Sequence, residues 1–305
     1  MTSVGLTPIN DLGTGSYLGF QGGLYPGGAN QRPEGHASTG LVLARSIEAL
    51  NANGNPDPDG KYVLLSIGMS NANQEFQMFL PDANADRDKD PDLVIVNGAQ
   101  GGATASEWAS ASSQVWSDAI QKLSQEGVNE NQVVVVWAKL ANSASSEMVE
   151  QYRTNLQLDV EAVFGVLRDK FPNLKLVYLS SRIYAGYATS SLNPEPYAYE
   201  SGFVMKWTIE KQLNGEIPDT PWLSWGPYLW ADGLMPRSDG LTWECTDLRE
   251  DDGTHPSDEG KRKVASLLLD YFKTDATARE WFLDSPGDTG DVIAPAPPEN
   301  LVVEP

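Results

Sequence analysis

The sequence predicts an α/β fold built on a parallel sheet, and three observations support this prediction. Short apolar runs of strand length alternate with longer segments whose apolar residues recur at helical spacing. The short runs lack an alternation of polar and apolar residues, as expected for parallel strands that helices cover on both faces. The chain has 305 residues, of which 40% are hydrophobic and nine are Trp, so it has enough apolar material for a large core.

Four strands are predicted from apolar runs, and they cover residues 62–67, 93–96, 133–137 and 174–179. A fifth strand is expected near residues 223–229. A long helix ending near Lys170 is predicted from one apolar stripe, formed by Leu156, Val160, Val163, Leu167 and Phe171. The last helix is expected after Pro256, with Ser257 as its N-cap.

The two ends of the chain differ in composition from the α/β region at residues 61–284. Residues 1–60 are rich in Gly, Asn and Pro, with one helix expected over 38–50, and we interpret them as a segment that wraps the domain. Residues 285–305 carry Gly, Asp and Pro without periodicity, which predicts a linker. The stretch APAPPENLVVEP resembles the opening of a fibronectin type III module, so we expect the natural chain to continue into further domains.

The charge balance excludes one class of function. The chain has 42 Asp and Glu against 21 Lys and Arg, a formal net charge of -21. Such a chain would be repelled by phosphate backbones and anionic lipid headgroups, so no nucleic-acid partner is expected. No membrane span is expected either, because no stretch approaches the roughly 18 apolar residues that one requires.

Two short motifs bring together the residue types of a serine hydrolase. Gly68, Met69, Ser70 and Asn71 directly follow the first predicted strand, which places a hydroxyl at the carboxyl end of the sheet, where active sites lie. Asp252 and His255 form a D-x-x-H element just before the last predicted helix. Serine needs an imidazole base and a carboxylate that fixes the tautomer of that imidazole. The motifs therefore predict a nucleophile, a base and an orienting acid, although a Ser-Asn turn and a solvated helix entry are the structural alternatives.

In this order, the motifs resemble the SGNH, or GDSL-like, hydrolase superfamily, over residues 61–274. GMSNA looks most like the GQSNM version of sialate O-acetylesterase-like and related carbohydrate acetylesterases. The resemblance implies a flavodoxin-like, three-layer α/β/α sandwich with a central parallel sheet. It also implies a serine esterase that removes acetyl or other short acyl groups, on carbohydrate, through Ser70, His255 and Asp252. This chemistry requires no metal and no organic cofactor.

The oxyanion hole of this superfamily is matched in part. NGAQGGATA, at residues 97–105, is similar to the N-x-x-x-x-G element, which makes Gly102 the oxyanion glycine beside the backbone of Ser70; a Gly-rich turn is the alternative. The third sequence block of the superfamily, to which residues 137–142 correspond, departs from the pattern. The superfamily has G-x-N-D or W-x-Q-G-E, whereas this chain reads WAKLAN over residues 137–142. Asn142 keeps the residue type and is favoured as the side-chain donor, and Lys139 keeps the position of the Gln.

Further residues are weaker candidates. Asn71 and Arg182 are candidate substrate-binding residues, and Arg182 could orient a substrate carboxylate or carbonyl or form an ion pair within the protein. Five Trp between residues 207 and 243 are either sugar-stacking platforms or core, and His36 is expected to be structural. The acidic loops at 55–60 and 82–90 are expected to be solvated rather than to bind calcium.

Two alternatives to a carbohydrate esterase stay open. The departing third block would suit a non-catalytic glycan-binding module. A lipid or aryl esterase would instead have a broad apolar cleft near Ser70. The single Cys245 allows no intramolecular disulfide, which fits the cytosol and also many secreted proteins. We expect a secreted or periplasmic bacterial protein whose signal peptide is missing from this sequence, with the cytosol as the alternative.

Overall fold

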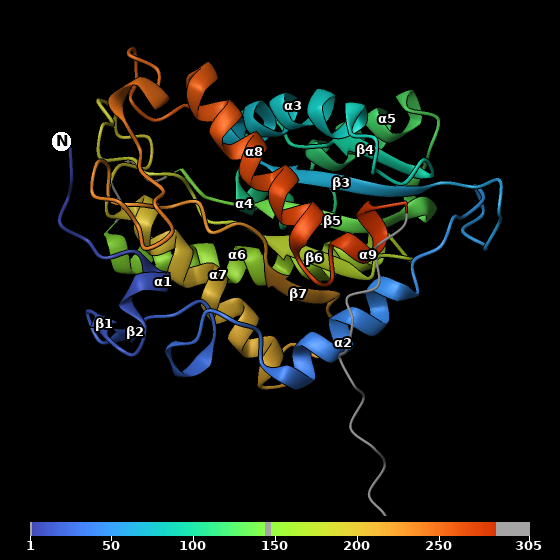
Figure 1. Ribbon diagram of the computed structural model, residues 1–305, viewed down its shortest axis with the longest axis horizontal. Coiled ribbons are helices and arrows are strands. Elements are labelled where there is room, and N and C mark those ends of the chain that lie inside the picture. Colours follow the sequence, from blue (N-terminus) through green and yellow to red (C-terminus); the bar gives the residue numbers. More distant parts are fainter. Residues whose placement is uncertain (1, 144–147, 285–305) are drawn as a thin grey trace, which may run out of the picture.

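A five-stranded parallel sheet lies at the centre of the computed structural model, which describes residues 2–143 and 148–284 (Figure 1). Across the sheet the strands are β4 (Leu93–Asn97), β3 (Tyr62–Gly68), β5 (Val133–Lys139), β6 (Leu176–Leu179) and β7 (Trp222–Trp225). Numbered along the chain within this sheet, the order is 2-1-3-4-5, which is the flavodoxin-like order. The predicted fold class is therefore confirmed. The predicted linker at 285–305 lies outside the described residues.

Helices cover both faces of the sheet, as the unbroken apolar strands require. On one face α3 (Ser70–Ala85) packs against α8 (Asp258–Thr274). On the other face α6 (Val149–Lys170) packs against α7 (Tyr197–Leu213). The shorter helices are α1 (Ile9–Leu12), α4 (Ala105–Trp108), α5 (Gln114–Gln125) and α9 (Arg279–Phe282), with the 3-10 turns η1 (Pro26–Gly28), η2 (Glu130–Gln132) and η3 (Cys245–Asp247).

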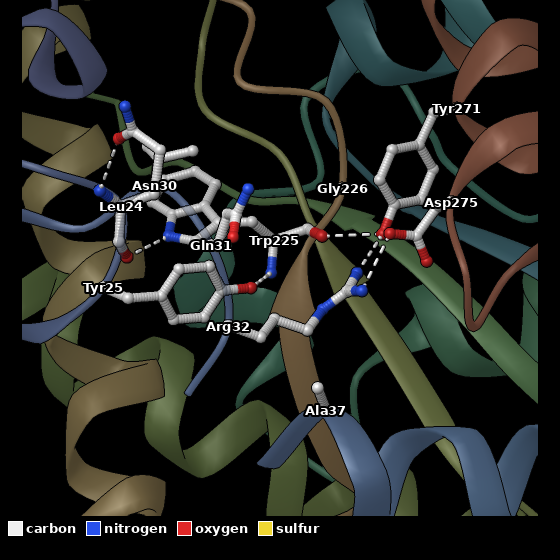
Figure 2. Close-up of a pocket in the computed structure, with 10 residues that line it drawn as sticks. All are labelled: Leu24, Tyr25, Asn30, Gln31, Arg32, Ala37, Trp225, Gly226, Tyr271 and Asp275. Atoms are coloured by element: carbon white, nitrogen blue, oxygen red, sulfur yellow. Dashed lines mark hydrogen bonds and ion pairs between the residues drawn. The ribbon is translucent and has the colours of Figure 1, made fainter. Parts of the chain in front are cut away.

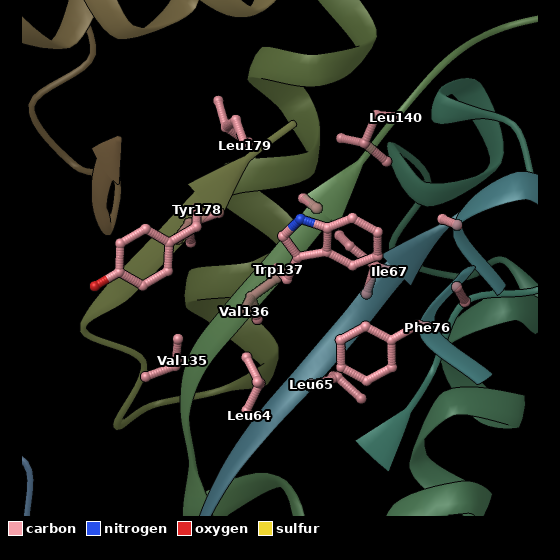
Figure 3. Close-up of a cluster of buried hydrophobic side chains, with 14 of the residues drawn as sticks. Leu64, Leu65, Ile67, Phe76, Val135, Val136, Trp137, Leu140, Tyr178 and Leu179 are labelled. Atoms are coloured by element: carbon pink, nitrogen blue, oxygen red, sulfur yellow. The ribbon is translucent and has the colours of Figure 1, made fainter. Parts of the chain in front are cut away.

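Buried apolar side chains of the sheet cluster with Phe76 of α3, and the rings of Trp137 and Tyr178 belong to this cluster (Figure 3). Trp137 on β5 is fully buried and stacks on Phe76 of α3, with ring centroids 5.4 Å apart. Its indole Nε1 donates a hydrogen bond to Ser180 Oγ at 3.0 Å, so this buried donor is satisfied. Four of the five Trp in the 207–243 region, Trp222, Trp225, Trp230 and Trp243, are buried and belong to the core.

The predictions for the two long helices are confirmed at the ends that were specified. The helix α6 ends at Lys170, and its predicted apolar stripe is buried. The helix α8 begins after Ser257, whose Oγ accepts a hydrogen bond from the backbone N–H of Gly260 at 3.3 Å. That bond satisfies one of the free N–H groups of the first turn. None of the helices within the described residues is both long enough and apolar enough to cross a membrane.

The helix predicted over residues 38–50 was placed too far along the chain. It is α2 (Glu34–Arg45), which begins directly after Pro33. Residues 46–50 leave the helix because Leu50 pairs with Lys61, each donating its backbone N–H to the carbonyl of the other at 3.0 Å. Pairing just ahead of β3 thus ends the helix early. His36 on α2 lies against Trp222, and its Nε2 is 2.7 Å from the carbonyl oxygen of Leu223, which is a structural role.

The first sixty residues run beside β7 and α7 and include a short hairpin, β1 (Ser16–Tyr17) and β2 (Phe20–Gln21) (Figure 1). Arg32 fastens this segment to the sheet edge. It forms an ion pair with Asp275 at 2.8 Å and donates hydrogen bonds to Ser224 Oγ and the Tyr271 hydroxyl. Figure 2 shows Arg32, Tyr271 and Asp275 among the residues that line a cavity of about 390 Å³. Because they satisfy one another, we assign them to the attachment of this segment.

Candidate active site

Ser70 is delivered by a sharp strand-to-helix turn at the carboxyl end of β3. Gly68 ends the strand with φ of +146°, and a Cβ there would lie 2.3 Å from the carbonyl oxygen of Lys139, so the turn requires glycine. Ser70 is the first residue of α3. Its backbone N–H therefore has no acceptor within the helix, and the helix dipole favours negative charge beside it.

The structure brings Ser70, His255 and Asp252 into one hydrogen-bonded chain. Ser70 Oγ lies 2.9 Å from His255 Nε2, and His255 Nδ1 lies 2.6 Å from Asp252 Oδ2. The two imidazole nitrogens thus face different partners, which is the arrangement that a general base needs. Ser70, His255 and Asp252 are all partly exposed, so the hydroxyl is within reach of a substrate.

The turn that carries His255 is organised around the carboxylate of Asp252. Asp252 Oδ1 accepts hydrogen bonds from the backbone N–H groups of Thr254 and His255, both at 2.8 Å. Burial opposes ionisation of this carboxyl, but these N–H groups and the imidazole hold its pKa below the ordinary value. Asp252 is thereby kept ionised and aimed at Nδ1.

Asn71 connects the nucleophile helix to the histidine turn. Its buried side chain donates a hydrogen bond from Nδ2 to the carbonyl oxygen of Thr254 at 3.0 Å. Asn71 directly follows Ser70 in the sequence, and Thr254 directly precedes His255. This contact gives the Asn71 amide a positioning role, and its predicted contact with substrate stays a prediction.

The loop after β4 comes to the same edge of the sheet. The backbone N–H of Gln100 donates to the carbonyl oxygen of Gly68 at 3.0 Å, which holds this loop beside the turn that precedes Ser70. Gly102 is exposed and has φ of +79°, a conformation that favours glycine. Within the described part of the chain, its backbone N–H has no hydrogen-bond acceptor. The role of this N–H in the oxyanion hole stays a prediction.

The Asn142 side chain is engaged elsewhere in this structure. Its Nδ2 donates to Asp159 Oδ2 at 2.6 Å, and its Oδ1 accepts from the backbone N–H of Ser106 at 3.0 Å. Both ends of the amide are thus used by α6 and α4. An amide nitrogen carries two hydrogens, and these contacts fix the direction in which the second hydrogen points.

Lys139, the other candidate donor, forms a buried ion pair with Glu75 of α3. Its Nζ lies 2.6 Å from each carboxylate oxygen, and both side chains are almost completely buried. Burial lowers the pKa of Lys139 to about 8 and raises that of Glu75, and each charge opposes the shift of its partner. Sequence reasoning missed Glu75, although a Lys at the end of an apolar strand signals that a carboxylate must lie near it.

Arg182, which follows β6, is also buried, but it forms no ion pair with any residue that the structure describes. Its side chain is 6% exposed, and its Nε and Nη2 atoms are fully enclosed without a hydrogen-bond partner in the described structure. Burial lowers its pKa, while Tyr152, Glu195 and Glu75 oppose that change through their charges. The ion pair within the protein that was the alternative for Arg182 is therefore absent from the described residues.

Residues 82–85 of the predicted acidic loop belong to α3, and the residues that follow are tied to α8. Asp86 and Asp88 both contact Lys273 Nζ, at 2.7 and 2.9 Å. Among residues 2–143 and 148–284, no group of three or more His, Cys, Asp or Glu has an arrangement that could hold a metal ion.

Comparison with known proteins gives resemblance at the level of structure. The sequence matches no protein-family model and no curated protein. The Bacillus subtilis protein YXIM has a TM-score of 0.43 and 12% identity, with 71% of this chain and 57% of that chain covered. A gut microbial diltiazem-metabolizing enzyme has a TM-score of 0.42 and 13% identity, with 75% and 48% covered.

A GDSL-like lipase from Bacteroides thetaiotaomicron is also similar. Its TM-score is 0.37 and its identity 9%, over 77% of this chain and 96% of the lipase. GDSL-like hydrolases are thus among the structural neighbours. The chain spans about half the length of the first two proteins.

Proposed function

We propose that the protein is a serine esterase that hydrolyses acetyl or other short acyl esters, with carbohydrate as the alcohol. The observation that carries this proposal is the chain of hydrogen bonds from Ser70 Oγ through both nitrogens of His255 to Asp252. An isolated Ser or His has many structural roles. A Ser-imidazole-carboxylate chain at the start of a helix activates a nucleophile.

In the proposed reaction, Ser70 Oγ attacks the ester carbonyl carbon while its proton passes to His255 Nε2. The carbonyl oxygen becomes an oxyanion, which accepts hydrogen bonds from the backbone N–H groups of Ser70 and Gly102. The intermediate expels the alcohol, which takes the proton from His255, and the acyl group stays on Ser70. A water molecule then gives a proton to His255 and attacks the acyl carbon. The bond from that carbon to Ser70 Oγ breaks, His255 returns its proton to Oγ, and the carboxylic acid leaves. A third donor would have to be an N–H of Asn142 or Lys139 that its present partner does not use.

A polar groove beside residues 97–105 and 137–142 supports the proposal that the alcohol half of the substrate is rich in hydroxyl groups. The groove has a volume of about 370 Å³ and is lined mainly by hydroxyl, amide and carboxylate side chains, with Thr104, Ser106, Asn142 and Asp159 among them. One side of the groove is formed by the segments that follow β4 and β5, and the other side by helix α6. Hydroxyl groups of a sugar would find both donors and acceptors there.

The proposal is tested by substrate preference. Purified protein is assayed on O-acetylated oligosaccharide, on p-nitrophenyl acetate and on p-nitrophenyl palmitate, with acetate or nitrophenol release as the readout. We expect the highest kcat/KM on the acetylated sugar and the lowest on palmitate. Preference for palmitate would indicate a lipid esterase and contradict the substrate class.

A non-catalytic glycan-binding module is the second candidate, and one observation favours it. Both side chains that could replace the missing third-block donor are held by partners, Asn142 by Asp159 and Lys139 by Glu75. If wild-type protein binds oligosaccharide in titration calorimetry but releases no acetate, this second candidate replaces the first.

A further inference from the structure

Arg182 lies at the carboxyl edge of the sheet, on the face that carries the candidate triad. It comes three residues after the end of β6, and β6 neighbours β5, the strand that ends at Lys139. Its charge acts on both members of the buried pair Lys139–Glu75, which lies between α3 and the sheet. Arg182 is therefore close to the base of the helix that begins with Ser70.

The chain that follows Arg182 packs against the turn of the triad. The backbone N–H of Thr189 donates to the carbonyl oxygen of Asp252 at 2.9 Å. Gly253 approaches this loop so closely that a Cβ would lie 2.0 Å from the carbonyl oxygen of Tyr187. The segment that begins with Arg182 thus leads from the end of β6 to the turn that carries Asp252 and His255.

Arg182 differs from the other buried cations because no described carboxylate contacts it. Four other Lys or Arg side chains are buried in the described structure, and each contacts a carboxylate: Lys139 with Glu75, Arg153 with Glu200, Lys206 with Glu210 and Arg237 with Asp239. Arg182 contacts none. A buried charge without a partner is costly, and the guanidinium group does not lose its proton to avoid that cost.

The nearby carboxylates are already used. Glu75 binds Lys139 through both oxygens. Glu195 accepts hydrogen bonds from the backbone N–H groups of Ala185 and Tyr199 and from Trp230 Nε1. Both carboxylates act on Arg182 through their charge without touching it. The chain has twice as many acidic as basic residues, so a shortage of acids does not explain the missing contact.

We propose that Arg182 is a specificity-determining residue that binds a carboxylate carried by the ester substrate. This inference rests on the proposed esterase function and narrows its substrate class to anionic esters. Because Nε and Nη2 are enclosed, the contact is expected through Nη1, as one charge-assisted hydrogen bond. The carboxylate belongs either to the acyl half or to the alcohol half of the ester.

The test compares esters of similar size, of which one is anionic and the other neutral. For the acyl half, the pair is mono-p-nitrophenyl succinate and p-nitrophenyl pentanoate. For the alcohol half, the pair is O-acetyl glucuronate and O-acetyl glucose. We expect wild-type protein to prefer the anionic member of one pair, by about tenfold to a hundredfold in kcat/KM. In Arg182→Met that preference should be lost, and Arg182→Lys should restore part of it.

The matched control is Lys206→Met, which removes a buried cation from α7 that has its own carboxylate partner. It should keep the wild-type preference ratio. Equal kcat/KM within both pairs for wild-type protein would overturn the inference while leaving the esterase proposal intact. So would an unchanged ratio in Arg182→Met.

A binding measurement covers the case in which no ester is hydrolysed. Titration calorimetry compares methyl hydrogen succinate with dimethyl succinate, on wild type and Arg182→Met. Charge-selective binding that Arg182→Met loses would support a carboxylate site even if the esterase proposal failed. Absence of charge-selective binding in wild type, together with no turnover, would overturn both.

Discussion

Asn71 donates a hydrogen bond from its side-chain amide to the carbonyl oxygen of Thr254 at 3.0 Å, and this bond joins the first turn of α3 to the turn that holds His255. The two residues are 183 positions apart in the sequence. The distance between Ser70 and His255 therefore depends on a contact between two of their sequence neighbours, Asn71 and Thr254.

Asn71→Ala should lower kcat about tenfold or more with little change in KM, because the imidazole would lose its fixed distance to Ser70. The stability should fall by about 1 kcal/mol from the lost hydrogen bond. Steady-state kinetics and urea unfolding measure the two effects. Asn71→Asp is the matched control, since an ionised carboxylate keeps the size but cannot donate. Wild-type kcat in both variants would refute the positioning role.

His255→Ala should cost more turnover than Asp252→Asn. Removal of the base eliminates proton transfer and should lower kcat on the order of a thousandfold or more. Loss of the orienting charge leaves an imidazole in place, so kcat should fall less. Single-turnover assays on p-nitrophenyl acetate at equal concentrations of folded protein compare the two variants. Negligible losses in both would reject this pair of residues as the catalytic base and acid.

Asp252 also predicts a pH dependence of stability. Its pKa in the folded state lies below the ordinary value of 3.8, so ionised Asp252 contributes stability above that pH. The contribution is lost as the pH falls from about 4 through the folded-state pKa. The free energy of unfolding should therefore fall more steeply below pH 4 in wild type than in Asp252→Asn. Parallel curves for the two proteins would contradict the assignment.

The buried pair between Glu75 and Lys139 predicts strong coupling in stability. Lys139→Met alone leaves a buried carboxylate without its partner and should cost about 3–5 kcal/mol. The double variant Glu75→Leu/Lys139→Met removes both charges and should recover most of that loss. Urea unfolding of wild type, both single variants and the double variant completes the cycle. Additive losses in the double variant would argue against a direct pair.

The oxyanion hole can be tested at Asn142. Because its amide is bonded to Asp159 and Ser106, we expect Asn142→Ala to lower kcat by less than about tenfold, leaving stabilisation to backbone N–H groups. Loss of a true oxyanion donor costs about a hundredfold to a thousandfold in kcat. A fall of that size would show that the amide turns to the oxyanion during the reaction.

Much of the fold could be predicted because its strands are unbroken apolar runs. The predicted ends were less reliable: β5 continues through Ala138 to Lys139, a residue whose charge suggests a loop but whose partner Glu75 makes burial possible. The α2 helix ends early because Leu50 pairs with Lys61. Both differences arise from contacts between distant residues, which periodicity does not record.

The candidate site was predictable where a motif carries it. Ser70, His255 and Asp252 stand in motifs whose order indicates their chemistry, and they come together in the structure. Glu75, the Asn71–Thr254 bond and the missing partner of Arg182 were not predictable, because each depends on what another element brings beside it. The third block is the intermediate case: its residues could be named, but not the directions in which they point.

The most direct test of the central claim is the turnover of Ser70→Ala. Hydrolysis of p-nitrophenyl acetate and of an O-acetylated oligosaccharide is measured for wild type and variant, with circular dichroism to establish equal folding. The account predicts that wild type hydrolyses both and that Ser70→Ala loses at least about a thousandfold in kcat, since removal of the nucleophile leaves only binding and the oxyanion hole. Retention of most of the wild-type rate by Ser70→Ala would contradict it.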